Sequence, residues 1–328
     1  MRVLIFITWP VKAWSIPDAQ VDALRARFPE IEFVHARTID EARVLIADAD
    51  AAFTPFLAPE AVAAAPRLKW VHSPAAAVEG LLPLEALSAR TITISNSRGI
   101  QAVPIAESVM GGLLVLARKY DRTLEAQRDR RWIQNDLVDD EYPWLLDGKQ
   151  MTIVGLGTIG IEIARRARAF GMSITGVRRH ADREKPPEVD RVFGADELDD
   201  ALTGCDILVL AAPGVAATRA MIGERELGLL NPGAVLVNIA RAAIVDQKAL
   251  MGGLESGRLG GAVLDVFEKE PLDPGSPLWS MRNVVITPHS SGFRASHWGD
   301  VIALYVDNMT RYQNGEPLRY LVDASAGY

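Results

Sequence analysis

The sequence predicts an α/β protein of two domains, each built around a parallel sheet. Short apolar runs alternate with amphipathic stretches twice along the chain, first over residues 1–100 and again from Met151 onward. This alternation is typical of strands joined by helices that cover both faces of a parallel sheet. The 328 residues also leave room for about two domains of ordinary size.

In the first domain, five short apolar runs are predicted to be strands: residues 3–7, 31–35, 51–54, 70–72 and 91–95. Residues 18–27 and 39–47 have apolar side chains at three- and four-residue spacing, which predicts amphipathic helices. Residues 101–131 follow as a long, mostly helical stretch that ends in a highly charged segment.

The second alternation gives the strands of the second domain, predicted at residues 152–155, 174–177, 207–211, 234–239, 261–266 and 284–287. Helices are predicted at residues 159–170, 224–230 and 243–256, where they cover the faces of the sheet. Helical spacing resumes near the end of the chain, over residues 295–313.

Composition favours a globular protein of a reducing compartment. The apolar fraction is 49% and the charged fraction 23%, while the formal charge of −7 weighs against nucleic acid or an anionic membrane as a partner. No apolar run approaches the roughly 20 residues that span a bilayer, and the first run is too short for a secretory segment. The single Cys205 excludes an internal disulfide, so a cytoplasmic location is expected, with Cys205 buried beside a strand.

A glycine fingerprint, Gly155-Leu156-Gly157-Thr158-Ile159-Gly160, follows a predicted strand and opens a predicted helix. Gly155 permits a tight turn, Gly157 allows the backbone to approach a pyrophosphate, and Gly160 allows close packing of helix and strand. The first-turn amides, including those of Thr158 and Ile159, then face the phosphates, where the helix dipole is favourable. A purely structural glycine-rich turn is the alternative.

The choice of dinucleotide is predicted from the end of the next strand. NAD enzymes carry an Asp or Glu there for the ribose 2′-hydroxyl, but this chain has Arg178-Arg179-His180. Two guanidinium groups are suited to a 2′-phosphate. We therefore expect NADP(H) to be preferred, with NAD(H) possible; the alternative is that both arginines are solvated loop charges.

Three residues at the ends of later strands supply what reduction of a 2-oxo acid requires. His289 carries an imidazole, which titrates near neutrality and can donate a proton to the carbonyl oxygen. Glu270 would hydrogen-bond the far nitrogen of that ring and keep it protonated. Arg241 would hold the carboxylate and polarise the carbonyl with its planar, always charged fork. Each alone has an ordinary structural interpretation; their joint occurrence after the fingerprint favours catalysis.

Together with the fingerprint, these residues resemble the D-isomer-specific 2-hydroxyacid dehydrogenase family over essentially the whole chain. The resemblance implies two Rossmann/flavodoxin-like domains with parallel sheets: a substrate domain of residues 1–98 plus 293–328, and a dinucleotide-binding domain, residues 99–292, inserted into it. It also implies that Asp265 accepts a hydrogen bond from the nicotinamide carboxamide, although an ordinary acid at a strand end is the alternative. It further implies that Pro213 and Ala240 contact the cofactor and that the helices of residues 101–131 form a homodimer.

The resemblance further implies that backbone amides of Ala76, Ala77 and Val78 bind the substrate carboxylate. This loop has alanines where the family commonly has glycine, and Ala242 follows Arg241 where glycine is usual. Glu270, in place of glutamine, argues against a formate dehydrogenase. The five histidines lack the spacing of metal ligands, so no metal is expected. His297 and Trp298 either line the mouth of the substrate site or pack the last helix.

The predicted function is that of an NADP-preferring 2-oxo acid reductase of the glyoxylate/hydroxypyruvate reductase kind, acting on a small 2-oxo or 2-hydroxy acid. An NAD-linked oxidiser resembling phosphoglycerate dehydrogenase is one alternative, and Arg178 and Arg179 weigh against it. A dinucleotide-sensing, corepressor-like binding protein is another, and the intact Arg241, Glu270 and His289 weigh against that.

Overall fold

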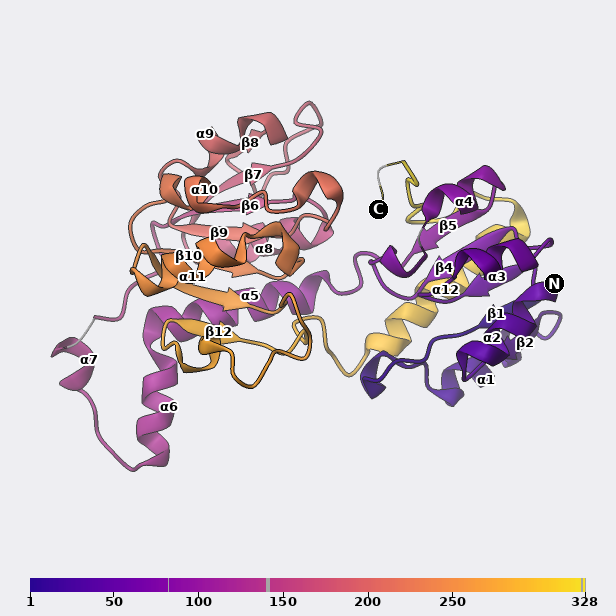
Figure 1. Cartoon of the computed structure of the whole chain (residues 1–328), viewed down its shortest axis with the longest axis horizontal. Helices are drawn as coiled ribbons and strands as arrows, with labels where there is room; N and C mark the ends of the chain where they lie inside the picture. The colour runs from indigo at the N-terminus through magenta and orange to yellow at the C-terminus, as the bar shows by residue number, and fades with distance from the viewer. Residues whose placement is uncertain (82, 140–141, 326, 328) are drawn as a thin grey trace. The chain divides into compact units, whose positions relative to one another are not determined.

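The computed structural model describes residues 1–81, 83–139, 142–325 and 327, and the chain divides into two compact units (Figure 1). Unit 1 comprises Met1–Ile100 and Phe293–Tyr328, and unit 2 comprises Gln101–Gly292. Each unit has one sheet, of five strands in unit 1 and seven in unit 2. All paired strands within these two sheets are parallel, so the predicted fold class is confirmed.

The sheet of unit 1 has the strand order β2-β1-β3-β4-β5, the flavodoxin-like order. Its strands are β1 (Arg2–Ile5), β2 (Glu32–His35), β3 (Ala51–Phe53), β4 (Trp70–Ser73) and β5 (Thr93–Asn96). Its α-helices are α1 (Asp18–Arg27), α2 (Ile39–Leu45), α3 (Pro59–Ala64), α4 (Leu84–Ala89) and α12 (His297–Asn314). Buried apolar clusters cover both faces, as expected for a parallel sheet.

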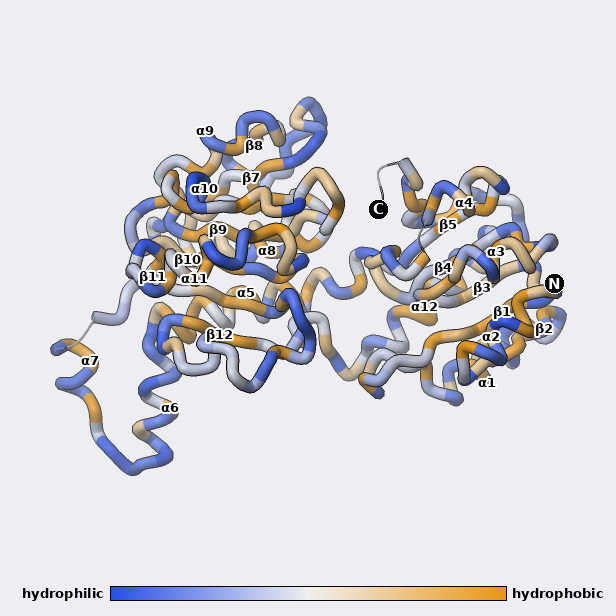
Figure 2. Tube along the Cα trace, viewed as in Figure 1, coloured by the Kyte–Doolittle hydropathy of each residue, from blue (hydrophilic) through white to orange (hydrophobic). Residues whose placement is uncertain are grey.

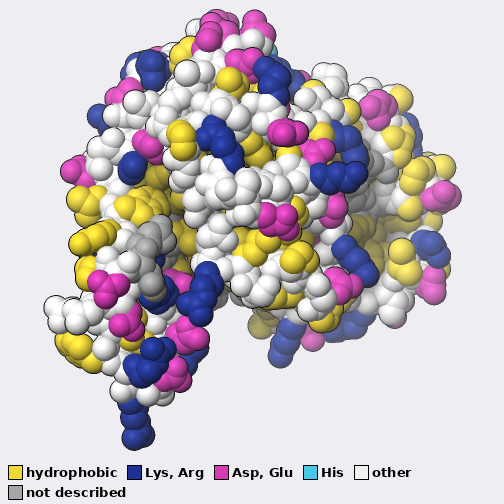
Figure 3. All heavy atoms as spheres, turned by 60° about the vertical axis from the view of Figure 1, so that its left-hand side comes forward, with side chains coloured by type: hydrophobic (Ala, Val, Ile, Leu, Met, Phe, Trp, Pro, Cys, Tyr) yellow, Lys and Arg dark blue, Asp and Glu magenta, His cyan; other side chains and the backbone are white. Residues whose placement is uncertain are grey.

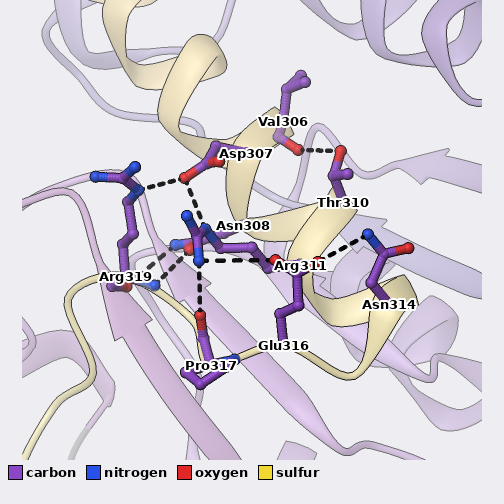
Figure 4. A network of polar contacts seen from close by, with 9 residues as sticks. All are labelled: Val306, Asp307, Asn308, Thr310, Arg311, Asn314, Glu316, Pro317 and Arg319. Atoms are coloured by element: carbon purple, nitrogen blue, oxygen red, sulfur yellow. Dashed lines mark hydrogen bonds and ion pairs between the residues drawn. The ribbon is translucent and has the colours of Figure 1, made fainter.

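Helix α12, from the end of the chain, belongs to the core of unit 1. Tyr305 is fully buried, and its ring stacks on those of Phe53 and Trp70, with centroids 4.0 and 5.5 Å away. The segment after α12 is fastened to it by a polar network (Figure 4), in which Asp307 accepts hydrogen bonds from Nε of both Arg311 and Arg319. This network brings the tail to the edge strand β5, where Leu321 forms an antiparallel bridge with Ser95.

The sheet of unit 2 has the strand order β12-β11-β10-β9-β6-β7-β8. The strands are β6 (Gln150–Val154), β7 (Ser173–Val177), β8 (Arg191–Phe193), β9 (Ile207–Leu210), β10 (Ala234–Asn238), β11 (Leu259–Leu264) and β12 (Val284–Ile286). The α-helices are α5 (Ala102–Arg118), α6 (Tyr120–Arg128), α7 (Asp136–Asp139), α8 (Thr158–Ala169), α9 (Leu198–Leu202), α10 (Glu224–Leu229) and α11 (Gln247–Glu255). Figure 2 shows the hydrophobic colour concentrated on the inner strands and on α5, whereas α6 is mainly hydrophilic.

Several boundaries differ from the sequence predictions for local reasons. Gly155 is predicted to end a strand, but β6 ends at Val154 and Gly155 begins the loop after it, with φ +106. The helix predicted to start at residue 243 starts at Gln247, because the Asp246 side chain caps it by accepting a hydrogen bond from the Ala249 amide. Lys119, with φ +55, divides the predicted helical stretch after residue 101 into α5 and α6.

The surface and the helices of the described residues give two further findings. Within the described ranges, no helix has both the length and the apolar character that crossing a bilayer demands. Figure 3 shows positive and negative side chains interspersed over the visible face. On that face, the mixture lacks the continuous basic surface that nucleic acids favour.

Candidate active site

The predicted site residues of unit 2 lie in loops along one edge of its sheet, because each of these loops follows the carboxyl end of a different parallel strand. From β12 to β7, successive loops carry His289, then Asp265 and Glu270, then Arg241, Pro213, the fingerprint 155–160, and Arg178 with Arg179. Neighbouring strands lie about 4.8 Å apart, so this row of loops spans roughly 24 Å. The chain reverses direction across the sheet at β6, which is where open α/β sheets form their ligand crevice.

The fingerprint has the geometry of a dinucleotide turn. A Cβ on Gly155 would lie 2.6 Å from backbone atoms of Ala211 and Ala212, and one on Gly160 would lie 2.1 Å from the Gly155 carbonyl oxygen. Among the described residues, Gly157 in contrast has no atom beyond its chain neighbours within 4 Å of where its Cβ would be, and it precedes α8 without a side-chain cap. The open space at Gly157 leaves room for a ligand at the start of α8, where helix amides suit a pyrophosphate.

Arg178 and Arg179 follow β7 as predicted but have different surroundings. The half-buried Arg178 donates from one terminal nitrogen to the carbonyl oxygens of Arg183 and Glu184. Its buried Nε has no hydrogen-bond partner among the described residues. Arg179 is exposed. Arg178 therefore also holds the loop that follows it, a role that the sequence did not indicate.

His289 and Glu270 form a direct pair. The His289 Nδ1 lies 2.7 Å from Glu270 Oε2, and the other carboxylate oxygen accepts a hydrogen bond from the Phe267 amide at 3.0 Å. The side chains of His289 and Glu270 are 50% and 36% exposed, so the pair is open to a ligand. With Nδ1 directed at the carboxylate, Nε2 is the ring nitrogen that can address a substrate.

Asp265 anchors the loop that carries His289. Its buried carboxylate accepts hydrogen bonds from the Thr287 hydroxyl at 2.6 Å, from the Ser290 and Ser291 amides at 2.9 and 3.1 Å, and from the Ser291 hydroxyl. Both sides of His289 are thereby fixed, and His289 itself has φ +51. The sequence indicated only a cofactor contact for Asp265, and this anchoring role was missed.

Arg241 is positioned by neighbours that the sequence prediction also missed. The buried Asn238 donates from its side chain to the Arg241 carbonyl oxygen at 3.1 Å and accepts from the Ala240 amide at 3.1 Å. The stem of Arg241 packs on Gly214, where a Cβ would lie 2.5 Å from Arg241 Cγ. The guanidinium donates to the Ala240 carbonyl oxygen at 2.7 Å.

Pro213 and Ala240, predicted cofactor contacts, lie in the loops after β9 and β10. Pro213 is exposed and its carbonyl oxygen accepts a hydrogen bond from the Thr218 hydroxyl at 2.7 Å. Ala240 is buried at 8% exposure, so its backbone rather than its side chain is the part that can meet a ligand.

In unit 1, residues 73–78 form the loop predicted to bind the substrate carboxylate, here called the carboxylate loop. Its carbonyl oxygens are held inward: those of Ala75, Ala76 and Ala77 accept from the Ser97 amide, the Asn96 side chain and the Ser73 hydroxyl at 2.9–3.0 Å. Over the described part of the chain, the amides of Ala76, Ala77 and Val78 have no acceptor. Successive amides of this kind suit an anion.

A buried chain of hydrogen bonds supports the carboxylate loop. The Trp70 indole N–H donates to Ser95 Oγ at 2.9 Å, Ser95 Oγ lies 2.7 Å from His72 Nδ1, and His72 Nε2 lies 3.1 Å from Ser97 Oγ. The Ser97 hydroxyl donates to the Ser73 carbonyl oxygen at 3.0 Å. The Ser97 hydroxyl proton is used on the Ser73 carbonyl oxygen, so Ser97 Oγ must accept a hydrogen bond from His72 Nε2. In the neutral ring, Nδ1 then accepts a hydrogen bond from the Ser95 hydroxyl. Complete burial lowers the pKa of His72 to about 3 and keeps it neutral.

His297 and Trp298, left open by the sequence, both pack within unit 1. His297 is 7% exposed and meets the Trp14 ring edge-on, while the Trp298 indole N–H donates to the Ala13 carbonyl oxygen at 3.0 Å. With Phe293 they also border a cavity of about 460 Å³. The two residues therefore pack the helix and line a recess; that they border a substrate site stays a prediction.

Comparison with known proteins places these features in a family. A family model described as D-isomer specific 2-hydroxyacid dehydrogenase, NAD binding domain, matches residues 110–291, more than half of the chain. The chain is 33% identical to a glyoxylate reductase of Thermococcus kodakarensis, over 96% of this chain and 95% of that protein.

Two solved structures are similar over nearly the whole chain. One is a D-isomer specific 2-hydroxyacid dehydrogenase family protein of Aeromonas salmonicida, with 32% identity, a TM-score of 0.81, and coverage of 98% of this chain and 99% of that one. The other is an NADPH-dependent glyoxylate/hydroxypyruvate reductase of Sinorhizobium meliloti in complex with NADP and sulfate, with 26% identity, a TM-score of 0.82, and coverage of 100% and 99%.

Proposed function

Because the chain belongs to the D-isomer-specific 2-hydroxyacid dehydrogenase family of NAD(P)-dependent oxidoreductases, we propose that it reduces 2-oxo acids to D-2-hydroxy acids, with NADPH as the preferred donor. The observation that carries the proposal is the hydrogen-bonded pair of His289 and Glu270 at the sheet edge that also bears the fingerprint. When bound, the reduced nicotinamide supplies the hydride for the carbonyl carbon. A proton for the carbonyl oxygen must then come from the protein.

His289 is the proton donor in this proposal. Its Nε2 donates to the substrate carbonyl oxygen as that oxygen gains negative charge. Glu270, 2.7 Å from Nδ1, holds the ring and stabilises its positive charge before the transfer. The Phe267 amide fixes the carboxylate in turn, so the ring keeps its direction without help from the substrate.

Two separate sets of donors suit the anionic part of a 2-oxo acid: Arg241 in unit 2 and the carboxylate loop in unit 1. Arg241 polarises the carbonyl and pairs with the carboxylate, and its packing on Gly214 limits the positions of its stem. Within unit 1, the amides of Ala76, Ala77 and Val78 are donors of a kind that suits a carboxylate. The alanines in this loop are consistent with that role, because it depends on the backbone.

The preference for NADP(H) is supported by the loop after β7, which carries Arg178 and Arg179 where an acid would be expected for NAD. The buried Nε of Arg178 has no hydrogen-bond partner within the part of the chain that the structure describes, and Arg179 is exposed. Because Arg178 also holds its own loop, Arg179→Ser is the cleaner test, and it is expected to lower the NADPH/NADH ratio of kcat/KM at least about tenfold. If this ratio is unchanged in both Arg179→Ser and Arg178→Asp, the preference for NADP(H) is contradicted and the NAD-linked alternative is favoured.

We also propose a homodimer that uses the arm, defined as α6, α7 and the segment between them. The arm extends from the sheet and helices of unit 2 in Figure 1 and exposes large apolar side chains. Tyr120 is 48% exposed, Leu124 52% and Trp132 89%. Exposed apolar groups gathered on one segment are typical of an interface.

A cytoplasmic location is proposed from the cysteine content. Cys205 is buried, as predicted, and burial raises the pKa of its thiol to about 11, so it is neither reactive nor paired. A chain with one inert cysteine needs no oxidising compartment.

The proposal is tested by the loss of reduced nicotinamide absorbance, measured in parallel for NADPH and NADH. The 2-oxo acids are glyoxylate, hydroxypyruvate, pyruvate and a bulky aromatic 2-oxo acid. Faster oxidation of NADPH with at least one acid is the expected result. Tight binding of a dinucleotide without oxidation by any acid would favour the corepressor-like alternative instead.

A further inference from the structure

The edge of the unit 1 sheet brings an aromatic surface next to the carboxylate loop. Strands β1, β3 and β4 are adjacent in the sheet and parallel, so the loops after them emerge side by side. The loop after β1 carries Trp9, the loop after β3 carries Phe56, and the loop after β4 is the carboxylate loop. With strands about 4.8 Å apart, the loops after β3 and β4 are close enough for one small molecule to touch both.

Phe56 is fixed against the segment that continues the carboxylate loop. The Leu57 amide donates to the Gly80 carbonyl oxygen at 2.9 Å, and a Cβ on Gly80 would lie only 2.8 Å from Phe56 Cδ1. The buried Thr54 hydroxyl also accepts from the Phe56 amide at 3.2 Å and donates to its carbonyl oxygen at 2.9 Å. The Phe56 ring therefore has a set position beside residues that follow Val78.

Trp9 packs on Phe56 and is held out of the core. The two ring centroids are 4.4 Å apart, with planes inclined by 56°. Trp9 remains 40% exposed although its backbone is fixed, because its amide donates to Ser15 Oγ at 2.9 Å and the Ser15 hydroxyl donates back to its carbonyl oxygen at 3.1 Å. Trp9 and Phe56 thus form an aromatic pair that is partly open to solvent beside the carboxylate loop, and such contiguous apolar surface can bind a ligand.

The segment between β1 and α1 carries a second tryptophan, Trp14, which lines the cavity beside His297 and Trp298. Trp14 packs edge-on against Phe293, with centroids 4.6 Å apart, and both border the cavity of about 460 Å³. Arg294 also borders the cavity, but it pairs with Asp300 at 2.6 Å, so its charge is already balanced. The volume is within the range of small-molecule pockets, and the walls are mainly aromatic.

We infer that the substrates are 2-oxo acids with a large apolar side chain, above all an aromatic one, whose ring packs on Trp9 and Phe56. The inference rests on the proposed function, because a carboxylate held by the amides of residues 76–78 fixes where the side chain begins. An aromatic ring that is attached through one methylene extends about 5 Å from that point. This is about the spacing between β4 and β3, and the loop after β3 carries Phe56. Glyoxylate has only a hydrogen at this position and leaves both rings in water.

The experiment compares kcat/KM for phenylpyruvate and glyoxylate, with NADPH, in the parent protein and in Trp9→Ala and Phe56→Ala. The parent is expected to favour phenylpyruvate at least about tenfold, because a buried phenyl ring contributes that much or more. Each variant is expected to lose at least about tenfold on phenylpyruvate and less than about threefold on glyoxylate. Trp279→Ala, at another exposed tryptophan, is the matched control and keeps the parent ratio.

A second readout separates this inference from the proposed function. Calorimetric titration of the NADP-loaded parent measures binding of D-phenyllactate and of glycolate without turnover. Tighter binding of phenyllactate, weakened in Trp9→Ala, supports the inference. Glycolate binding as tightly as phenyllactate, or equal kcat/KM for both 2-oxo acids, overturns it while the reductase function stands. If phenyllactate binds selectively but no 2-oxo acid is reduced, the proposed function fails and the aromatic site remains.

Discussion

His289 has the left-handed backbone conformation, with φ +51, and residues other than glycine adopt it at a cost of about 1–3 kcal/mol. The hydrogen bonds that Asp265 accepts from Thr287, Ser290 and Ser291 offset this cost, since they fix the chain on both sides of His289. The backbone at His289 is thereby held by its neighbours in the chain and not only by the contact of its ring with Glu270.

Asp265→Asn tests this anchoring role. The amide cannot accept all of these hydrogen bonds, so kcat for 2-oxo acid reduction is expected to fall at least about tenfold, while the Kd of NADPH changes less than about threefold. Stopped-flow turnover and fluorescence titration of NADPH measure the two quantities. Asp200→Asn, at an exposed position, serves as the control. A loss confined to NADPH affinity would support the carboxamide contact predicted from the sequence and count against anchoring.

His72 links stability to pH in a defined direction. Its folded pKa of about 3 is below the unfolded value of about 6.5, so the unfolded chain binds more protons between these pH values. The free energy of unfolding therefore falls, by about 1.4 kcal/mol per unit, as the pH drops below about 6.5, and the full stability is present above it.

Urea unfolding of the parent and of His72→Gln at pH 7 and pH 5 measures this linkage. The parent is expected to lose about 2 kcal/mol more than the variant over that interval. His180→Gln, at an exposed histidine, is expected to follow the parent. Equal losses in parent and His72→Gln would mean that His72 is not the buried neutral group described above.

Within helix α8 and the turn before it, Gly160 and Gly157 have different roles, the first in packing and the second in ligand approach, and alanine substitutions distinguish them. In Gly160→Ala, the new Cβ meets the Gly155 carbonyl oxygen, so stability is expected to fall by about 1–3 kcal/mol. In Gly157→Ala, the new Cβ stands in open space, so the midpoint of thermal unfolding is expected to stay within a few degrees while the Kd of NADPH rises at least about tenfold. Calorimetry and NADPH titration check both variants; unchanged affinity in Gly157→Ala would argue against a pyrophosphate at this turn.

The strands that carry the site were predictable because each is a buried apolar run followed by a turn. Short elements at the margin were not: β8 (Arg191–Phe193) is an edge strand of mixed polarity, and α9 (Leu198–Leu202) is barely more than one turn. Their structure depends on packing against β7, which a single sequence does not display.

The site residues could be predicted from the sequence, but the residues that support them could not. Arg241, Glu270 and His289 follow strand ends and could be chosen by position and chemistry. Asn238 and the pair of Ser95 and Ser97 could not, because their role depends on strand register and on the folding of loops, which brings them to partners elsewhere in the chain.

For the whole molecule, the exposed apolar side chains of the arm predict the oligomeric state. The parent is expected to elute as a particle of about twice 35.7 kDa in size-exclusion chromatography with light scattering. Leu124→Arg is expected to shift it to the monomer, because a charge replaces an apolar contact. Val44→Arg, at an exposed valine of α2 outside the arm, should leave the mass unchanged. A monomeric parent would contradict the dimer.

The central claim is that this chain transfers a hydride to a 2-oxo acid with His289 as the proton donor. The rate of NADPH oxidation at saturating 2-oxo acid, compared between the parent and His289→Gln, tests it most directly. The account predicts turnover by the parent and a kcat lower by about 10²-fold or more in the variant, with the Kd of NADPH unchanged. Equal turnover in both proteins would contradict it.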